Sequence, residues 1–132
     1  MQPDCNAPET SLMACQAIMS ASLTTAQALT LWHDVALAMV RDDEPDLSVR
    51  QMSILLTIYL EAPPHTVRGL AHKLGVSKPV VTRALDAMGK LDLVSRRRDE
   101  HDRRNVLVQR TVRGALYLER LADTIGKLSQ EL

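Results

Sequence analysis

Aromatic residues are almost absent from this sequence of 132 residues, which has no phenylalanine and only Trp32, Tyr59 and Tyr117. Its core must therefore be built from Leu, Val, Ile, Ala and Met, which favours helices packed through aliphatic faces. So few aromatic rings also leave no platform on which single-stranded bases stack. No apolar run has the roughly 18 residues of a membrane span, and the opening MQPDCNAPET lacks the pattern of a secretory signal. We expect a cytoplasmic protein with no membrane partner.

Cysteine is also scarce, and the patterns typical of enzymes are missing. A disulfide between Cys5 and Cys15, the two cysteines, would close only a short loop, so we expect reduced thiols. No glycine-rich phosphate loop follows a strand, no paired histidine motif lies on a helix, and the four histidines are scattered. We therefore expect no enzymatic activity, no cofactor and no metal site.

The net charge is zero, from 16 basic and 16 acidic residues, which at first argues against a nucleic-acid-binding protein. The distribution of charge changes this conclusion. Residues 1–61 contain two basic and eight acidic residues, a net charge of −6, whereas residues 62–113 contain twelve basic and five acidic residues, a net charge of +7. Affinity for an anionic polymer depends on a local basic surface rather than on the total charge. The middle of the chain is thus the candidate nucleic-acid-binding region.

Hydrophobic periodicity predicts two helices in the first half of the chain. The first covers residues 25–41, where apolar residues at spacings of three and four share one face: Leu29, Trp32, Val35, Ala36 and Met39. The second begins after Ser48, which can form a capping box with Gln51, and ends near Leu60. We expect its inward face to consist of Met52, Leu55, Leu56 and Tyr59.

Two short helices and a hairpin are predicted in the basic region. Thr66 caps the first helix, which ends at Gly75, and Ser77 caps the second, which has Pro79 in its first turn. A buried stripe on the second helix is expected at Val81, Ala84, Leu85 and Met88. Segments 93–98 and 105–110 have the composition of strands and are joined by a polar turn. This order is the pattern of a winged helix-turn-helix.

Thr111 is expected to cap a last helix, whose apolar stripe contains Leu118, Leu121, Ala122, Ile125 and Leu128. The fold class is therefore α+β and mainly helical, a winged helix-turn-helix with flanking N- and C-terminal dimerisation helices. We divide the chain into a partly helical N-terminal extension (1–24), a dimerisation helix with an acidic linker (25–46), the DNA-binding domain (47–111) and a C-terminal dimerisation helix (112–132).

Over roughly residues 25–125 the sequence resembles the MarR family of bacterial winged-helix regulators. The resemblance rests on LSVRQMSILL at 47–56, TVRGLAHKLGVSKPVVTRALDAM at 66–88, LVSRR at 93–97, and DRRNVLVQRT at 102–111 with Gly114 after it. It implies a homodimer that binds a pseudo-palindromic site in double-stranded DNA and regulates transcription, most simply as a repressor. The alternative from another class is a winged-helix module whose basic face binds an acidic protein.

In that family the recognition helix enters the major groove and a wing-tip arginine, steadied by an aspartate, enters the minor groove. The resemblance assigns the recognition-helix contacts to Ser77, Lys78, Pro79, Val80, Thr82 and Arg83, and the wing contacts to Asp102, Arg103 and Arg104. Arg96 and Arg98 are further candidates on the wing. Arg83 is suited to a guanine edge, whereas Lys78 and the Ser77 hydroxyl are suited to phosphates. In a narrow minor groove, Arg104 would read shape more than base identity.

The sequence departs from the family pattern at two positions near the wing. Arg110 stands where a buried leucine is usual, so either the end of the strand is open or the guanidinium is paired. Asp92 replaces a usual glycine, which predicts a left-handed backbone at a residue that tolerates it better than most.

The ends of the chain also depart from that pattern. Family members usually continue into another C-terminal helix, whereas this sequence ends at Leu132. We expect the N-terminal residues Leu12, Cys15, Ile18 and Met19, at helical spacing, to form the dimer interface together with the last helix.

Two further sites follow from the resemblance. Many members bind a small aromatic or acidic effector between the dimerisation helices and the winged domain, for which Trp32, His33 and Arg41 are candidate lining residues. Peroxide-sensing members use an N-terminal cysteine, so Cys15 is a candidate redox switch. A reactive thiol needs exposure and a lowered pKa, and the apolar stripe around Cys15 favours an ordinary packed thiol.

Overall fold

The computed structural model describes residues 22–132, and the predicted α+β, mainly helical class is confirmed. The helices are α2 (Thr25–Arg41), α3 (Val49–Leu60), α4 (Val67–Leu74), α5 (Lys78–Lys90) and α6 (Val112–Gln130). The strands are β1 (His65–Thr66), β2 (Val94–Arg98) and β3 (Val106–Arg110). Within the described residues no helix combines the length and the hydrophobicity that crossing a membrane requires. The first 21 residues of the expected N-terminal extension lie outside this range.

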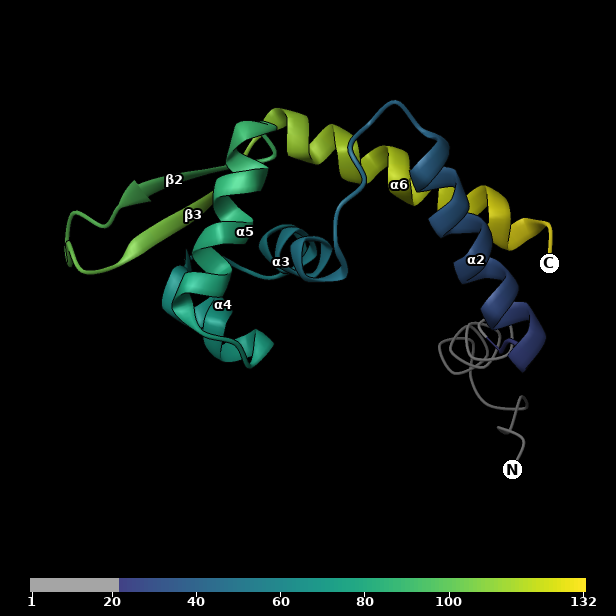
Figure 1. Cartoon of the computed structure of the whole chain (residues 1–132), viewed down its shortest axis with the longest axis horizontal. Coiled ribbons are helices and arrows are strands. Elements are labelled where there is room, and N and C mark those ends of the chain that lie inside the picture. The colour runs from purple at the N-terminus through teal and green to yellow at the C-terminus, as the bar shows by residue number, and fades with distance from the viewer. Residues whose placement is uncertain (1–21) are drawn as a thin grey trace, which may run out of the picture.

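The molecule has two parts that are joined by the long helix α6 (Figure 1). One part is a lobe in which α3, α4 and α5 pack together and the β2–β3 hairpin projects outward. The other part is an arm in which α2 crosses α6. This arrangement separates the candidate recognition helix and wing from the helices expected to mediate dimerisation.

Local capping explains where most helices begin. The Ser48 hydroxyl accepts a hydrogen bond from the Gln51 backbone N–H at 3.1 Å, and the Gln51 side chain accepts one from the Ser48 N–H at 2.8 Å, so the predicted capping box is present. Thr66 and Thr111 cap α4 and α6 in the same way through their hydroxyls. Gly75 ends α4 in the left-handed conformation, with φ of 68°, as predicted. Ser77 is the N-cap residue of α5, but its side chain makes no capping hydrogen bond.

The core of the lobe is aliphatic, as the composition predicts. All four residues of the stripe predicted on α5 are buried, namely Val81, Ala84, Leu85 and Met88. The inward face predicted for α3 is confirmed at three of its four residues: Leu55 is buried, and the half-buried Met52 and Tyr59 pack against the core. The prediction omitted Ile54 and Ile58, which are also buried, and Leu56 is half-buried without being part of the core. The elements that pack against α3 are α5, β3 and α6.

The wing is a hairpin of β2 and β3, to which β1 adds a short third strand in the order β1-β3-β2. The pairs Val94–Arg110 and Arg98–Val106 mark the two ends of the antiparallel hairpin. β1 was not predicted, because two residues, His65 and Thr66, are too few to show a strand periodicity. It holds the start of α4 against Leu107 and Val108 of the wing.

The two departures from the family pattern have structural explanations. Asp92 has φ of 58°, the predicted left-handed conformation. The Arg110 guanidinium is paired: its Nε donates to the Ile58 carbonyl at 2.9 Å, and its Nη2 donates to the carbonyls of Tyr59 at 3.2 Å and Glu61 at 3.4 Å. Arg110 therefore satisfies carbonyls at the C-terminal end of α3, which have no partner within the helix.

Tyr59 fixes the position from which α6 leaves the lobe. Its hydroxyl donates to the Thr111 carbonyl at 2.7 Å and accepts from the Thr111 N–H at 3.0 Å. The Thr111 hydroxyl in turn donates to the Asp92 carbonyl at 2.7 Å. Gly114, in the first turn of α6, lies so close that a Cβ atom would be 2.3 Å from both the Tyr59 hydroxyl and the Leu93 carbonyl oxygen. Only glycine fits this position without displacing its neighbours.

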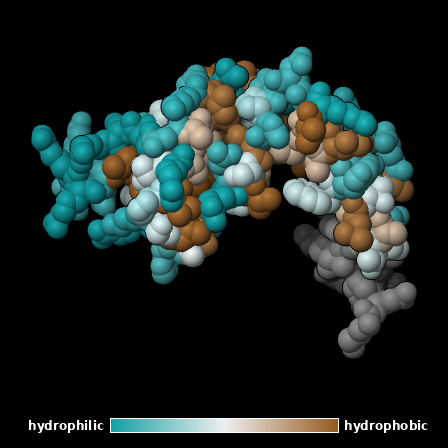
Figure 2. Space-filling view, in the orientation of Figure 1, coloured by the Kyte–Doolittle hydropathy of each residue, from teal (hydrophilic) through white to brown (hydrophobic). Residues whose placement is uncertain are grey.

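The apolar faces predicted for α2 and α6 are partly uncovered in the single chain. Val35 is the buried residue of α2, whereas Leu29 and Trp32 are 66% and 61% exposed. On α6 the buried residues are Gly114 and Tyr117, while Ala122 and Ile125 of the predicted stripe are exposed. Figure 2 shows hydrophobic side chains at the surface of this arm.

We predict that Gly114→Ala lowers the free energy of unfolding by about 1–3 kcal/mol, because the added methyl group overpacks the Tyr59–Leu93 contact. Gly126→Ala is the matched control, since nothing lies within 4 Å of its Cβ position and alanine gains up to about 1 kcal/mol of helix propensity. Urea unfolding of both variants at one protein concentration measures the difference. Equal stability of the two variants would contradict the described junction.

Candidate nucleic-acid interface

The free positive charge of the described chain is concentrated on the lobe and its wing. Within residues 22–132, some lysine and arginine side chains form ion pairs with carboxylates, namely Lys73, Arg96, Arg104, Arg113 and Arg120. The other basic residues of the lobe have no carboxylate partner there, and they are Arg50, Arg68, Lys78, Arg83, Lys90, Arg97, Arg98, Arg103 and Arg110. Figure 2 shows the projecting hairpin as hydrophilic almost throughout.

Helix α5 presents the sequence-predicted contact residues along its outer side. Ser77, Lys78, Pro79 and Arg83 are exposed, while Val80 and Thr82 are half-buried. The Ser77 hydroxyl is not used in capping, so it is available to an external acceptor. Arg83 makes only a long contact, 3.4 Å from its Nε to the Pro79 carbonyl. The helix therefore offers two cations and a hydroxyl to an anionic partner.

Asp86, the acidic residue of α5, is tied to the wing. Its Oδ1 accepts a hydrogen bond from Arg96 Nη2 at 2.7 Å. Arg96 is therefore occupied in joining β2 to α5, and in this conformation it is not free for the DNA contact predicted from the sequence. The pair has a second effect: it neutralises the carboxylate of Asp86, which lies about one turn after Arg83 on the same helix.

The wing tip is ordered by its own polar side chains. Arg98 Nη1 donates to the Arg103 carbonyl at 2.9 Å, which connects the end of β2 to the turn. Asp102 Oδ1 accepts from the Arg104 backbone N–H at 3.1 Å and lies 3.5 Å from the Arg104 Nε. The Arg104 side chain is still 89% exposed. Asp102 thus orients Arg104 outward without burying it, whereas Arg103 is exposed with no acidic partner among the described residues.

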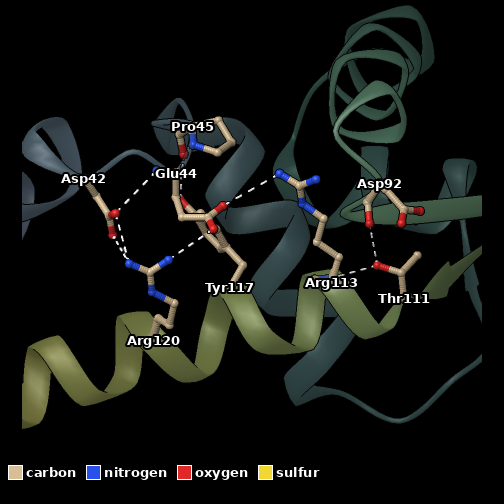
Figure 3. A network of polar contacts seen from close by, with 9 residues as sticks. Asp42, Glu44, Pro45, Asp92, Thr111, Arg113, Tyr117 and Arg120 are labelled. Atoms are coloured by element: carbon tan, nitrogen blue, oxygen red, sulfur yellow. Dashed lines mark hydrogen bonds and ion pairs between the residues drawn. The ribbon is translucent and has the colours of Figure 1, made fainter.

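A network of acidic and basic residues connects the α2–α3 linker to α6 (Figure 3). Arg120 donates to Asp42 at 3.0 Å and to Glu44 at 3.1 Å, and Arg113 lies 3.9 Å from the other oxygen of Glu44. The Tyr117 hydroxyl donates to the Pro45 carbonyl at 3.1 Å. The sequence did not predict this network, because the acidic stretch was interpreted only as a linker. The signal was the spacing of Arg113, Tyr117 and Arg120, which places all three on one face of α6.

The network borders a small hollow between α2, the acidic linker and α6, lined by Met39, Asp42, Glu44, Tyr117 and Arg120 among others. Its volume is about 30 Å³, which corresponds to about one water molecule and lies far below the roughly 300 Å³ of a ligand pocket. The predicted effector residues Trp32, His33 and Arg41 do not line this hollow, and they point from three different sides of α2. His33 is instead paired with Asp34 at 2.9 Å.

The candidate redox residue, Cys15, lies outside the described residues, as do Leu12, Ile18 and Met19 of the expected dimer interface. Among residues 22–132, no cluster of His, Cys, Asp and Glu has the composition and geometry to hold a metal ion.

Comparisons with known proteins show which family this architecture resembles. Residues 47–106 match the model of the MarR family. The fold is similar to that of a mutant of MepR from S. aureus, with a TM-score of 0.68 and 17% identity over 83% of this chain and 82% of that one. The transcriptional regulator BldR from Sulfolobus solfataricus has a TM-score of 0.58 and 26% identity, over 93% and 80% of the two chains.

A third similar structure is CouR from Rhodococcus jostii RHA1 bound to p-coumaroyl-CoA, with a TM-score of 0.57 and 22% identity over 95% of this chain and 78% of that one. No curated protein sequence matches the chain significantly. The resemblance to MarR-family regulators found in the sequence is therefore confirmed by the family model and by the fold.

We predict that Tyr117 makes stability fall at alkaline pH. Burial raises the pKa of Tyr117 above its ordinary value of 10.0, and the nearby carboxylates of Glu44, Asp46 and Asp42 raise it further. Because the folded state holds this proton more tightly than the unfolded state, its contribution is fully present below pH 10 and is lost as the pH rises toward the folded-state pKa.

Tyr117→Phe is the comparison variant. It should cost about 0.5–1.5 kcal/mol at pH 8 through loss of the hydrogen bond to Pro45, and its free energy of unfolding should decline less steeply above pH 10 than that of the wild type. Chemical unfolding between pH 8 and 11 measures both. Parallel declines for the two proteins would refute the role assigned to Tyr117.

Proposed function

Since the chain carries a MarR-family winged helix-turn-helix at residues 47–106, we propose that it is a sequence-specific regulator of transcription that binds double-stranded DNA. It acts as a homodimeric repressor on a pseudo-palindromic operator and is released by a small effector. The observation that carries the proposal is the concentration of unpaired cations on α5 and the wing of a chain whose net charge is zero. A basic surface of this kind is the electrostatic footprint of a DNA-binding domain.

Helix α5 supplies the major-groove contacts in this proposal. Arg83 is exposed and free of carboxylates, so its guanidinium can pair with the two acceptors of a guanine edge, which is worth about 1–3 kcal/mol of discrimination. Lys78 and the uncapped Ser77 hydroxyl, at the start of the helix, bind phosphates and fix its register. Pro79, Val80 and Thr82 complete the contact surface on that helix.

The wing supplies the minor-groove contacts. Arg104, aimed outward by Asp102, enters the groove and reads its width. Arg103 and Arg98 bind the adjacent backbone. Arg96 contributes by holding α5 and the wing in a fixed relation through Asp86.

A second copy of the chain covers the exposed apolar face of the arm. Leu29, Trp32 and Val40 lie on one face of α2 and are each more than 60% exposed. The N-terminal segment and α6 complete this interface. In a two-fold dimer each copy presents its recognition helix to one half-site, and the half-sites lie about 34 Å apart on the duplex.

A small aromatic or acidic effector is proposed to act between the arm and the lobe. CouR, whose structure contains p-coumaroyl-CoA, has a similar fold. In the present conformation the hollow lined by Tyr117 and Arg120 is too small for such a molecule. Effector binding therefore requires α2 and the acidic linker to separate from α6, a movement that would change the spacing of the two DNA-binding lobes.

We predict that Arg83→Ala and Arg104→Ala each weaken binding to an operator-like duplex obtained by selection from a random-sequence pool. Arg83→Ala should cost about 1–3 kcal/mol and relax the sequence preference, whereas Arg104→Ala should weaken binding chiefly at A·T-rich sites with a narrow minor groove. Fluorescence anisotropy measures both. Lys127→Ala, which removes a charge near the end of α6, is the control. Unchanged affinity in both arginine variants would overturn this model and leave a protein-binding winged helix as the better function.

We predict that the wild-type chain sediments as a dimer of about 29 kDa, twice its mass of 14.7 kDa, at micromolar concentration. Trp32→Glu should shift the equilibrium toward the monomer, because it places a charge in the proposed interface. Analytical ultracentrifugation distinguishes the two states. A wild-type monomer at micromolar concentration would exclude the proposed dimer.

A further inference from the structure

Arg50, in the first turn of α3, lies beside the recognition helix although it belongs to the acidic half of the sequence. It and Arg41 are the basic residues among the first 61 residues. Arg50, Ser48 and Gln51 form one wall of a groove whose other wall consists of Val80, Arg83 and Ala84 of α5. The groove has a volume of about 360 Å³ and is open to solvent.

The groove is electropositive. None of its lining residues is acidic, and neither Arg50 nor Arg83 forms an ion pair with any described residue. Asp86, the acidic residue of α5, is held by Arg96 on the wing side of the helix. Two exposed guanidinium groups from different helices thus face one space without a counter-charge.

The position of the groove relative to α5 identifies the ligand. If α5 lies in the major groove of a duplex, its two long sides face the two sugar–phosphate backbones that border that groove. The wing occupies the side of Arg96, and α3 occupies the opposite side, along Val80, Arg83 and Ala84. Arg50 is therefore placed at the backbone rather than at the bases. The positive end of the α3 dipole adds partial positive charge at the same place.

We propose that Arg50 binds a backbone phosphate of the DNA strand that passes along the α3 side of the recognition helix, with Arg83 beside it. This inference rests on the proposed function and extends the DNA-binding surface to α3, outside the helix-turn-helix and the wing. The contact positions the recognition helix but carries no sequence information, because phosphates are the same at every base pair.

The test compares Arg50→Gln with Arg41→Gln in the full-length chain. Arg41 is the matched control, since it is also exposed and unpaired among the described residues but lies at the end of α2. Affinities are measured by fluorescence anisotropy between about 50 and 200 mM salt, for a duplex selected from a random pool and for a scrambled duplex of the same length.

Arg50→Gln should weaken binding to both duplexes by about fivefold to tenfold per bound protomer at about 0.1 M salt, and should reduce the slope of log K against log salt by about one per protomer. Arg50→Lys should retain most of the slope, because it keeps the charge, and Arg41→Gln should behave as the wild type. Thermal unfolding of Arg50→Gln should match the wild type, because the side chain is exposed.

Each other outcome has a definite meaning. Wild-type affinity and slope in Arg50→Gln would overturn the phosphate contact while leaving the proposed function intact. A loss confined to the selected duplex would assign Arg50 to base recognition and would also overturn it. A wild-type chain that binds neither duplex would refute the proposed function, and this inference with it.

Discussion

The hydroxyl of Tyr59 is the contact on which the relation between the two parts of the molecule depends. It is hydrogen-bonded to both the N–H and the carbonyl of Thr111, and Thr111 is the residue that caps α6. Arg110 lies over the Tyr59 ring, 5.5 Å from its centroid, and binds the carbonyls at the end of α3. The end of the wing, the end of α3 and the start of α6 are thus fixed together. The direction of α6, and with it the position of the arm, follows from this junction.

The arm is held at a second point by the Arg120–Asp42–Glu44 network. The two points differ in character: the Tyr59 junction is partly buried and packed around Gly114, whereas the network is largely exposed and sensitive to salt. A movement between arm and lobe would therefore break the network first and leave the junction intact. In the proposed dimer, this difference makes the acidic linker the place where an effector would act on the spacing of the two lobes.

The sequence predicted those features that depend on local chemistry. Residues within one or two turns determine the caps at Ser48, Thr66 and Thr111, the left-handed Gly75 and the buried stripe of α5. The left-handed Asp92 was predicted from the family resemblance instead. Features that depend on distant partners were missed or misassigned. The pairing of Arg96 with Asp86 joins residues ten positions apart, and that of Arg120 with Asp42 joins residues 78 apart. Periodicity within one helix or strand cannot predict such contacts. For the same reason, the position of Arg50 beside Arg83 is seen only in the folded structure.

In the proposed function, local charge on one face of the molecule, rather than the zero net charge of the chain, determines what this protein binds. The most direct test is the salt dependence of wild-type binding to a duplex selected from a random pool. We expect a linear fall of log K with log salt, with a slope near −0.9 for each phosphate contacted and a total of about −5 or steeper for a dimer. A slope near zero, or no duplex binding at low salt, would contradict it.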